Sequence, residues 1–196
     1  MAESRRKQLT KKLFKTALIE LMQDKPFHRI TIKEICAQAD LNRTTFYLHY
    51  KDQKELLDDI LSELREKTSE HLSDITYGDN ENLALKKYLE FVKENAVLFR
   101  TILFRALMDG NIDLCTRDLV ITSFIEDIRD RLPSFGSELE NRYFYTYMIE
   151  GSVSLVARWI ENDFDLTTDE LANLISNLNL TLSKYKGNNI PSPNKK

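Results

Sequence analysis

Residues 30–57 read ITIKEICAQADLNRTTFYLHYKDQKELL, and the spacing of their polar and apolar side chains predicts three helices in close succession. The first helix should begin at Thr31, because Thr31 and Glu34 have the spacing of a capping box, in which each side chain accepts from the other residue's backbone N–H. Four apolar side chains then recur at the intervals of one buried helix face, namely Ile32, Ile35, Cys36 and Ala39. This helix should pack by one face and leave the other exposed.

A sharp turn and a second, shorter helix are predicted next. Asp40 lies where the chain must reverse, and Asp tolerates the left-handed backbone of such a turn better than most residues. Leu41 should fill the corner, and Asn42 can act as the N-cap of a helix over residues 43 to about 50. Two helices joined in this way form a helix-turn-helix, whose second helix enters the major groove of DNA.

The second helix carries side chains suited to that role. Residues 43–45 are the N-terminal residues of this helix, which in a helix-turn-helix contact the base edges in the major groove. Phe46 and Tyr50 form the apolar side of the helix. Tyr47 is the strongest candidate for a contact, since a phenol on the exposed side of so short a helix has little core to enter. The predicted DNA-binding set also includes caps and phosphate contacts, and comprises Thr31, Lys33, Asn42, Arg43, Thr44, Thr45, Tyr47, His49, Tyr50, Lys51 and Lys54.

A third helix should begin at Asp52, which forms another possible capping box with Glu55 and opens a helix N-terminus that favours a nearby phosphate. It should run to about residue 74 and link two domains. Each of these features also has a structural explanation without DNA. Capping boxes and aromatic stripes occur in many proteins, Thr31 is first of all a cap, and an isolated histidine such as His49 is more often a surface or capping residue.

The density of these signals resembles the tetracycline-repressor-like (TetR/AcrR) family of bacterial transcription regulators. The resemblance covers about the first quarter of the chain, and the residues that carry it are Thr31, Ile32, Ile35, Cys36, Ala39, Leu41, Thr45, Phe46, Tyr47, His49, Tyr50, Lys51 and Leu56. Two positions depart from the usual pattern. Gln53 replaces a common Lys, with Lys54 following it, so we expect the phosphate contact to be displaced by one position. Asp40 replaces a common Gly.

Charge is distributed unevenly along the chain. Residues 1–54 hold 12 Lys or Arg against 6 Asp or Glu, a balance of +6, whereas residues 55–196 hold 16 against 25, a balance of −9. A basic end joined to an acidic body is the pattern expected when only that end approaches nucleic acid. Arg5, Arg6 and Lys7 are expected to form a mobile basic arm ahead of the first helix.

Composition limits the remaining possibilities. With 196 residues, 42% apolar side chains, 5 Gly and 4 Pro, the chain is predicted to be all-α. No apolar run approaches the roughly 20 residues that span a bilayer, and the N-terminus is charged, so we expect a cytoplasmic protein. Cys36 and Cys115 lack ligand-spaced neighbours, so no metal, disulfide or cofactor is expected. The three histidines are scattered without a nucleophile motif, so an enzyme is not expected.

The expected organisation is a helix-turn-helix DNA-binding domain over residues 1–51, a linking helix over 52–75, a helical regulatory and dimerisation domain over 76–186, and a disordered tail over 187–196. A leading helix over residues 7–23 should close the small core with one apolar face, which comprises Leu9, Leu13, Phe14, Ala17, Leu18 and Leu21. Further helices are predicted over residues 83–94, 96–108, 112–131, 137–162 and 168–184.

The last two predicted helices carry apolar side chains around more of their circumference than one buried face requires. We therefore expect them to pack against the same two helices of a second subunit in a two-fold symmetric four-helix interface. The family resemblance implies the same, and the body also resembles the subgroup that includes the dihydroxyacetone-kinase regulator. An intramolecular core is the alternative. The predicted interface comprises Tyr143, Tyr147, Gly151, Leu155, Trp159, Leu171, Leu174, Ile175 and Leu178.

The resemblance further implies a small-molecule effector that binds the body domain, shifts the linking helix and releases DNA. The aromatic side chains of the body domain have two interpretations, as walls of the effector pocket or as part of the hydrophobic core. The candidate walls are Phe91, Phe99, Phe104, Met108, Phe124 and Tyr147. We therefore expect a homodimeric regulator, a repressor in the first instance, on a palindromic double-stranded DNA operator. The alternative is a protein-interaction module or co-regulator that works with a partner regulator.

Overall fold

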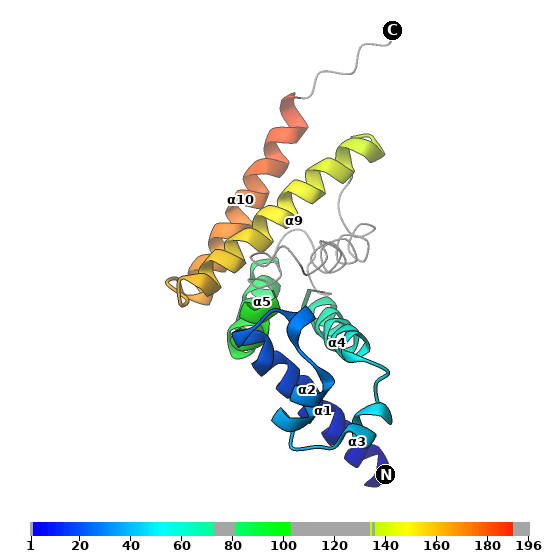
Figure 1. The fold of residues 1–196 in the computed structure, drawn as a ribbon. Helices are drawn as coiled ribbons and strands as arrows, with labels where there is room; N and C mark the ends of the chain where they lie inside the picture. Colours follow the sequence, from blue (N-terminus) through cyan, green and yellow to red (C-terminus); the bar gives the residue numbers. More distant parts are fainter. Residues whose placement is uncertain (1, 73–80, 103–133, 135, 190–196) are drawn as a thin grey trace. The chain divides into compact units, whose positions relative to one another are not determined.

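The structure is a computed structural model that describes residues 2–72, 81–102, 134 and 136–189. Every regular element in these ranges is a helix, so the predicted all-α class is confirmed (Figure 1). The elements are α1 (Ala2–Asp24), the 3-10 turn η1 (Phe27–Arg29), α2 (Ile32–Gln38), α3 (Arg43–Tyr47), α4 (Gln53–Leu72), α5 (Glu81–Glu94), α6 (Ala96–Arg100), α9 (Glu138–Glu161) and α10 (Thr168–Asn189).

The chain divides into two compact units, which are described separately. The N-terminal unit comprises residues 1–67 and 95–120, and the C-terminal unit comprises residues 68–94 and 121–196. The predicted helix over residues 112–131, residues 103–108 of the one over 96–108, and Cys115 lie outside the described residues. Within the described ranges, no helix is long and apolar enough to cross a membrane, and no group of three His, Cys, Asp or Glu is placed to hold a metal ion.

The core of the N-terminal unit forms between α1, α2, α3 and the first part of α4. Its fully buried side chains include one or two from each helix, namely Phe14, Leu18, Ile35, Phe46 and Leu56. The rings of Phe14 and Phe46 meet edge to face with centroids 5.2 Å apart, which fixes α3 against α1. Leu9 and Leu13 were predicted on the same apolar face of α1 but are exposed, because the buried part of that face begins at Phe14.

Helix α1 also begins earlier than the sequence suggested. Arg5, Arg6 and Lys7 lie within α1 as exposed helical residues, so the predicted mobile basic arm is wrong. The physical reason is that Arg, Lys, Gln and Glu are good helix formers and no Gly or Pro interrupts the first turns. The Thr10 hydroxyl donates to the Arg6 carbonyl at 2.9 Å, a further local contact within this first part of α1.

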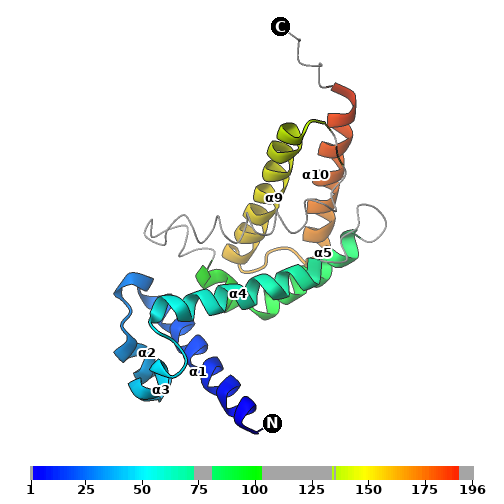
Figure 2. The ribbon, with the colours of Figure 1, turned by 90° about the vertical axis from the view of Figure 1, so that its right-hand side faces the viewer.

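In the C-terminal unit, α9 and α10 run antiparallel as a helical hairpin, and α10 also packs against α5 (Figure 2). Helix α9 starts with a capping box between Ser137 and Glu140, as the predicted helix over residues 137–162 requires. At the hairpin corner, Asp163 and Phe164 both have positive φ, and the Trp159 indole N–H donates to the Leu166 carbonyl at 2.7 Å. Helix α10 continues to Asn189, so the first three residues of the predicted disordered tail are helical.

Candidate nucleic-acid interface

The start of α2 is held by the capping box that the sequence predicted. The Glu34 N–H donates to the Thr31 hydroxyl at 3.3 Å, and the Thr31 N–H donates to the Glu34 carboxylate at 2.9 Å. A hydrogen bond from Lys25, and then those from Thr31, lower the pKa of Glu34 from 4.5 to about 2. Because the folded pKa lies below the unfolded value, this cap stabilises the fold above about pH 4.5 and loses its effect as the pH falls toward 2.

The turn between α2 and α3 has the predicted geometry. Asp40 adopts φ of 53°, the left-handed conformation that Asp tolerates, and the Leu41 N–H donates to the Cys36 carbonyl at 2.9 Å. Asn42 then caps α3, because its side-chain oxygen accepts from the Thr45 N–H at 2.8 Å and from the Thr45 hydroxyl at 3.0 Å. Asn42 and Thr45 are therefore occupied with each other, and their main role in the structure is to set the start of α3.

The exposed side of α3 carries the side chains that are free to meet a ligand. Helix α3 itself ends at Tyr47, earlier than the predicted end near residue 50, and the backbone continues for one more turn. Tyr47 is 59% exposed although its ring still touches Phe46 edge to face. Thr45 and His49 are half-buried, and the other predicted contacts outside the core are exposed, namely Thr31, Lys33, Asn42, Arg43, Thr44, Lys51 and Lys54.

Tyr50 does not belong to this exposed set, and its inclusion among the DNA-binding residues was wrong. Its side chain is 2% exposed, and its ring packs against Phe14 and Phe46. Its hydroxyl donates to the Asp59 carboxylate at 2.8 Å. Both the aromatic body and the polar end of Tyr50 are thus used inside the N-terminal unit.

Leu48 is the residue that the sequence interpretation missed. It is 78% exposed, directly after Tyr47, and its N–H donates to the Thr44 carbonyl at 3.2 Å, so Thr44 and Leu48 share one side of the helical turn. Leu48 therefore adds an apolar side chain to the exposed surface that includes Tyr47. The sequence does carry a signal for this exposure. Phe46 and Tyr50 are apolar neighbours four residues apart, whereas the residues four positions before and after Leu48 are the polar Thr44 and Asp52.

At the start of α4 the predicted capping box is present only in part. The Glu55 N–H donates to the Asp52 carboxylate at 2.9 Å, but the Glu55 carboxylate accepts from the Lys51 N–H at 2.5 Å instead of from that of Asp52. Gln53, which replaces the common Lys, donates through its amide to the Ile30 carbonyl at 3.4 Å. Gln53 thereby connects α4 to Ile30, the residue that follows η1, and Lys54 next to Gln53 in the sequence is exposed.

Ion pairs reduce the basic charge that is available to a polyanion. Lys25 pairs with Glu34, and Lys11 and Lys15 pair with carboxylates of α4. Arg43, Lys51 and Lys54 make no ion pair with any residue that the structure describes. The basic surface around α3 therefore rests on these exposed cations more than on the overall balance of residues 1–54.

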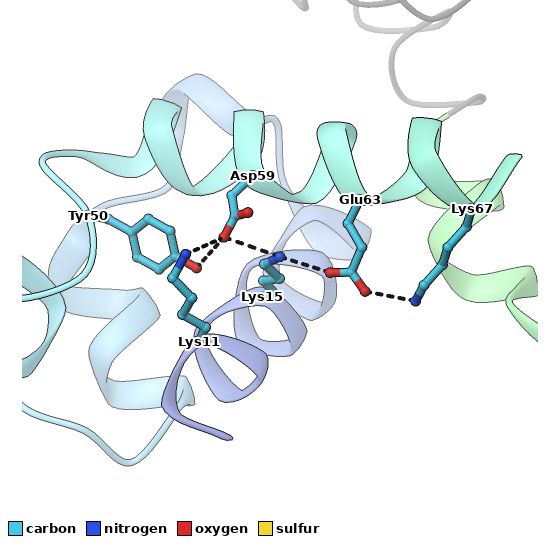
Figure 3. A network of polar contacts seen from close by, with 6 residues as sticks. All are labelled: Lys11, Lys15, Tyr50, Asp59, Glu63 and Lys67. Atoms are coloured by element: carbon cyan, nitrogen blue, oxygen red, sulfur yellow. Dashed lines mark hydrogen bonds and ion pairs between the residues drawn. The ribbon is translucent and has the colours of Figure 1, made fainter. Parts of the chain in front are cut away.

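A network of polar contacts links α1, the end of the α3 turn and α4 within the N-terminal unit (Figure 3). One oxygen of Asp59 accepts from the Tyr50 hydroxyl and pairs with the Lys11 and Lys15 ammonium groups, each at 3.2 Å. Lys15 also pairs with Glu63 at 2.8 Å, and Glu63 pairs with Lys67 at 2.7 Å. The Lys11 ammonium group lies 5.3 Å from the centre of the Tyr50 ring.

The protonation states in this network are well defined at neutral pH. Burial, and then the hydrogen bond to Asp59, raise the pKa of Tyr50, so its hydroxyl keeps its proton and donates. Burial would raise the pKa of Asp59, but the hydrogen bonds from Tyr50, Lys15 and Lys11 outweigh it, so the pKa is lowered and the carboxylate is charged. Asp59 is thus an anion held by one neutral and two cationic donors.

The predicted interface residues of the C-terminal unit separate into two groups. Trp159, Leu171 and Ile175 are each 2% exposed within the single chain, so their assignment to a subunit interface was wrong. They pack inside the unit because α9, α10 and α5 already cover that face. The exposed or half-buried remainder comprises Tyr143, Tyr147, Gly151, Leu155, Leu174 and Leu178, and the exposed Leu139 precedes Tyr143 by one turn on α9.

The predicted effector pocket is only partly within the described residues, which exclude Phe104, Met108 and Phe124. Phe99 is buried in the N-terminal unit, and Phe91 in the C-terminal unit stacks on His71 with ring centroids 4.5 Å apart. Tyr147 is exposed, so it does not line a closed cavity among the described residues. The pocket stays a prediction.

The capped helix-turn-helix and the helical C-terminal unit together define a transcription regulator of the helix-turn-helix class. Residues 16–60 match the sequence family described as bacterial regulatory proteins, tetR family, and residues 79–180 match the family described as transcriptional regulator C-terminal region. The chain belongs to the tetR family of bacterial regulatory proteins. The family predicted from residues 30–57 is therefore confirmed.

Individual relatives agree with this assignment. Over 142 residues, 71% of this chain and 73% of the relative, the sequence is 28% identical to the HTH-type dhaKLM operon transcriptional activator DhaS of Lactococcus lactis subsp. lactis (strain IL1403). It is 24% identical over 183 residues, 87% of this chain and 62% of the relative, to the uncharacterized HTH-type transcriptional regulator YuxN of Bacillus subtilis (strain 168). These relatives are named as transcriptional regulators.

Solved structures share the fold. The dihydroxyacetone kinase operon activator DhaS superposes with a TM-score of 0.55 at 23% identity, covering 90% of this chain and 97% of that one. A TetR transcriptional regulator from Streptococcus agalactiae 2603V superposes with a TM-score of 0.64 at 19% identity, covering 91% and 98%. At these identities the likeness concerns the fold alone.

Proposed function

We propose that this regulator binds a specific, approximately palindromic DNA operator as a homodimer, with α3 of each subunit in the major groove of one half-site. The observation that carries the proposal is the exposed side of α3, where Arg43, Thr44, Tyr47 and Leu48 project from a helix fixed at its start by Asn42. Lys51 and Lys54 flank this surface as exposed cations suited to phosphates.

The proposed dimer uses the exposed part of the α9–α10 hairpin. Leu139, Tyr143, Tyr147 and Gly151 follow one another at intervals of four residues, and the first three are exposed apolar or aromatic side chains. A Cβ added at Gly151 would meet no atom within 4 Å, so this part of α9 offers space for a close helix approach. Leu174 and Leu178 supply the matching stripe on α10.

The direction of regulation has two candidates. Repression, relieved when a small effector binds the C-terminal unit, would need a coupling of about 1 to 3 kcal/mol between effector and operator. Activation is favoured by the name of the Lactococcus relative, an operon transcriptional activator. A reporter gene behind the selected operator decides between them, since deletion of the regulator gene would raise expression in the first case and lower it in the second.

Selection of bound sequences from a random duplex pool tests the central proposal, and Tyr47→Ala is its key variant. The wild type should enrich a palindrome, and Tyr47→Ala should lower affinity for that palindrome by at least about tenfold, because an exposed contact at the groove is lost. Lys54→Ala is the control, and it should weaken binding to all duplexes equally and reduce the salt slope by about one. A folded wild type that enriches no sequence would leave the chain as an interaction module or partner-dependent co-regulator.

Leu48 is expected to read a thymine methyl group, the apolar feature of the major groove. Replacing each operator thymine in turn with deoxyuracil removes that methyl group and should weaken wild-type binding at one position per half-site by roughly fivefold or more. Leu48→Ala should bind the thymine and deoxyuracil operators equally well. If the variant remains as sensitive as the wild type to every replacement, Leu48 does not contact a thymine methyl.

A further inference from the structure

Asp59 is placed where three separate parts of the N-terminal unit come together. Its carboxylate accepts a hydrogen bond at 2.8 Å from the hydroxyl of Tyr50, which lies at the end of the turn after α3. The same carboxylate pairs with Lys11 and Lys15 of α1 at 3.2 Å each (Figure 3). The Asp59 side chain is only 31% exposed. The Asp59 carboxylate on α4 therefore joins Tyr50, at the end of the turn after α3, to α1.

Helix α3 depends on such contacts with its neighbours because it is very short. Helix α3 has 5 residues, far below the roughly 12 to 15 at which an isolated helix becomes even marginally stable. Its start is oriented by Asn42, and its apolar side by Phe46. Beyond Tyr47 the chain is held by Tyr50, whose N–H donates to the Phe46 carbonyl at 2.9 Å and whose hydroxyl reaches Asp59.

The Tyr50 hydroxyl is the directional part of this attachment. The aromatic packing of Tyr50 against Phe14 and Phe46 limits its position, but apolar packing is non-directional, whereas a hydrogen bond to a carboxylate selects one distance and angle. Tyr50 is three residues from Tyr47 and two from Leu48, so a change in its angle moves both exposed side chains relative to the bases.

We propose that Asp59 is a positioning residue for DNA recognition, which acts through Tyr50 to hold the exposed side of α3 at the angle that sequence-specific contacts require. The inference rests on the proposed DNA binding. It assigns to Asp59 a role in distinguishing the operator from other DNA rather than in contacting DNA. Affinity for arbitrary DNA, which depends on phosphate contacts, should not depend on that angle to the same degree.

The test compares two variants that remove or weaken the Tyr50–Asp59 hydrogen bond with a third variant that changes only the neighbouring carboxylate, Glu63. Tyr50→Phe removes the hydroxyl without changing charge, and Asp59→Asn removes the carboxylate charge. The matched control is Glu63→Gln, one turn further along α4, because Glu63 pairs with Lys15 and Lys67, whereas the Tyr50 hydroxyl donates to Asp59. For each protein, affinity is measured on the selected operator and on an unrelated duplex of the same length, and stability is measured by urea unfolding.

Tyr50→Phe should lower operator affinity by roughly tenfold and leave affinity for the unrelated duplex unchanged, since a hydrogen bond to a charged group is lost without loss of a cation. Asp59→Asn should also lower the ratio of operator to unrelated-duplex affinity. The double variant should lose less than the sum of the two single losses, because both changes affect the Tyr50–Asp59 hydrogen bond. Glu63→Gln should leave the ratio unchanged.

The inference is overturned if Tyr50→Phe retains the wild-type affinity ratio, or if Glu63→Gln lowers the ratio as much at a comparable loss of stability. Should Asp59→Asn fail to fold, the result for Tyr50→Phe decides, since that variant keeps the aromatic core. A wild type that prefers no sequence overturns the proposed function itself. A wild type that prefers the operator, with a Tyr50→Phe variant that does so equally, overturns the positioning role alone.

Discussion

Phe46→Ala is expected to lower the free energy of unfolding of the N-terminal unit by about 3 to 5 kcal/mol, the usual cost of removing a buried phenylalanine. Phe46 is fully buried, and its ring contacts Phe14, Tyr47 and Tyr50 with centroids between 5.2 and 5.8 Å apart. The cavity cannot be closed by the short α3 without displacing Tyr47. Operator binding should be lost together with stability.

Urea unfolding followed by circular dichroism measures this loss, and Leu48→Ala is the matched control. Leu48 lies two residues further on and is mostly exposed, so its removal should change the free energy of unfolding by no more than about 0.5 kcal/mol. A Phe46→Ala variant whose free energy of unfolding is less than about 1 kcal/mol below that of the wild type would show that Phe46 does not support α3 in the way its burial indicates.

Leu178→Glu is expected to convert the proposed dimer into a monomer. Leu178 is 45% exposed on α10, and a carboxylate buried there opposite a second apolar surface would be desolvated without a partner. The dissociation constant of the dimer should rise by roughly 30-fold or more, as for interface hot spots. Operator affinity should fall in parallel, because each monomer would hold only one half-site.

Leu180→Glu provides an unusually close control for this change. Leu180 is also 45% exposed on α10, but it lies two residues on and therefore points about 200° around the helix from Leu178. Sedimentation equilibrium should find Leu180→Glu dimeric and Leu178→Glu monomeric. If both variants dissociate equally, or if neither variant dissociates, the subunit interface does not lie on the side of α10 that carries Leu174 and Leu178.

Much of the N-terminal unit was predictable because its defining signals act over three or four residues. The Thr31 capping box and the cap at Asn42 each join a side chain to a backbone group within one turn, and the left-handed conformation at Asp40 concerns a single residue. The Ser137 capping box at the start of α9 is of the same kind. Such features depend on only a few neighbouring residues, so their spacing indicated where α2, α3 and α9 begin and which family the chain belongs to.

The roles of chemically similar side chains were decided by tertiary packing. Tyr47 and Tyr50 are the same residue type three positions apart, yet one is exposed and the other is enclosed by Phe14 of α1 and tied to Asp59 of α4. Lys11 and Lys15 likewise form ion pairs with carboxylates 44 to 48 positions away in the sequence. No spacing rule within one helix carries that information.

The same division holds in the C-terminal unit. The pattern of apolar residues located α9 and α10 and indicated more apolar surface than one face needs, because helical periodicity is a local property of the chain. Which apolar residues are covered depends on the neighbouring helices, and only the packed unit separates the buried Trp159, Leu171 and Ile175 from the exposed Tyr147. Local order thus follows from the sequence, while the assignment of each side chain to core or surface follows from contacts between distant segments.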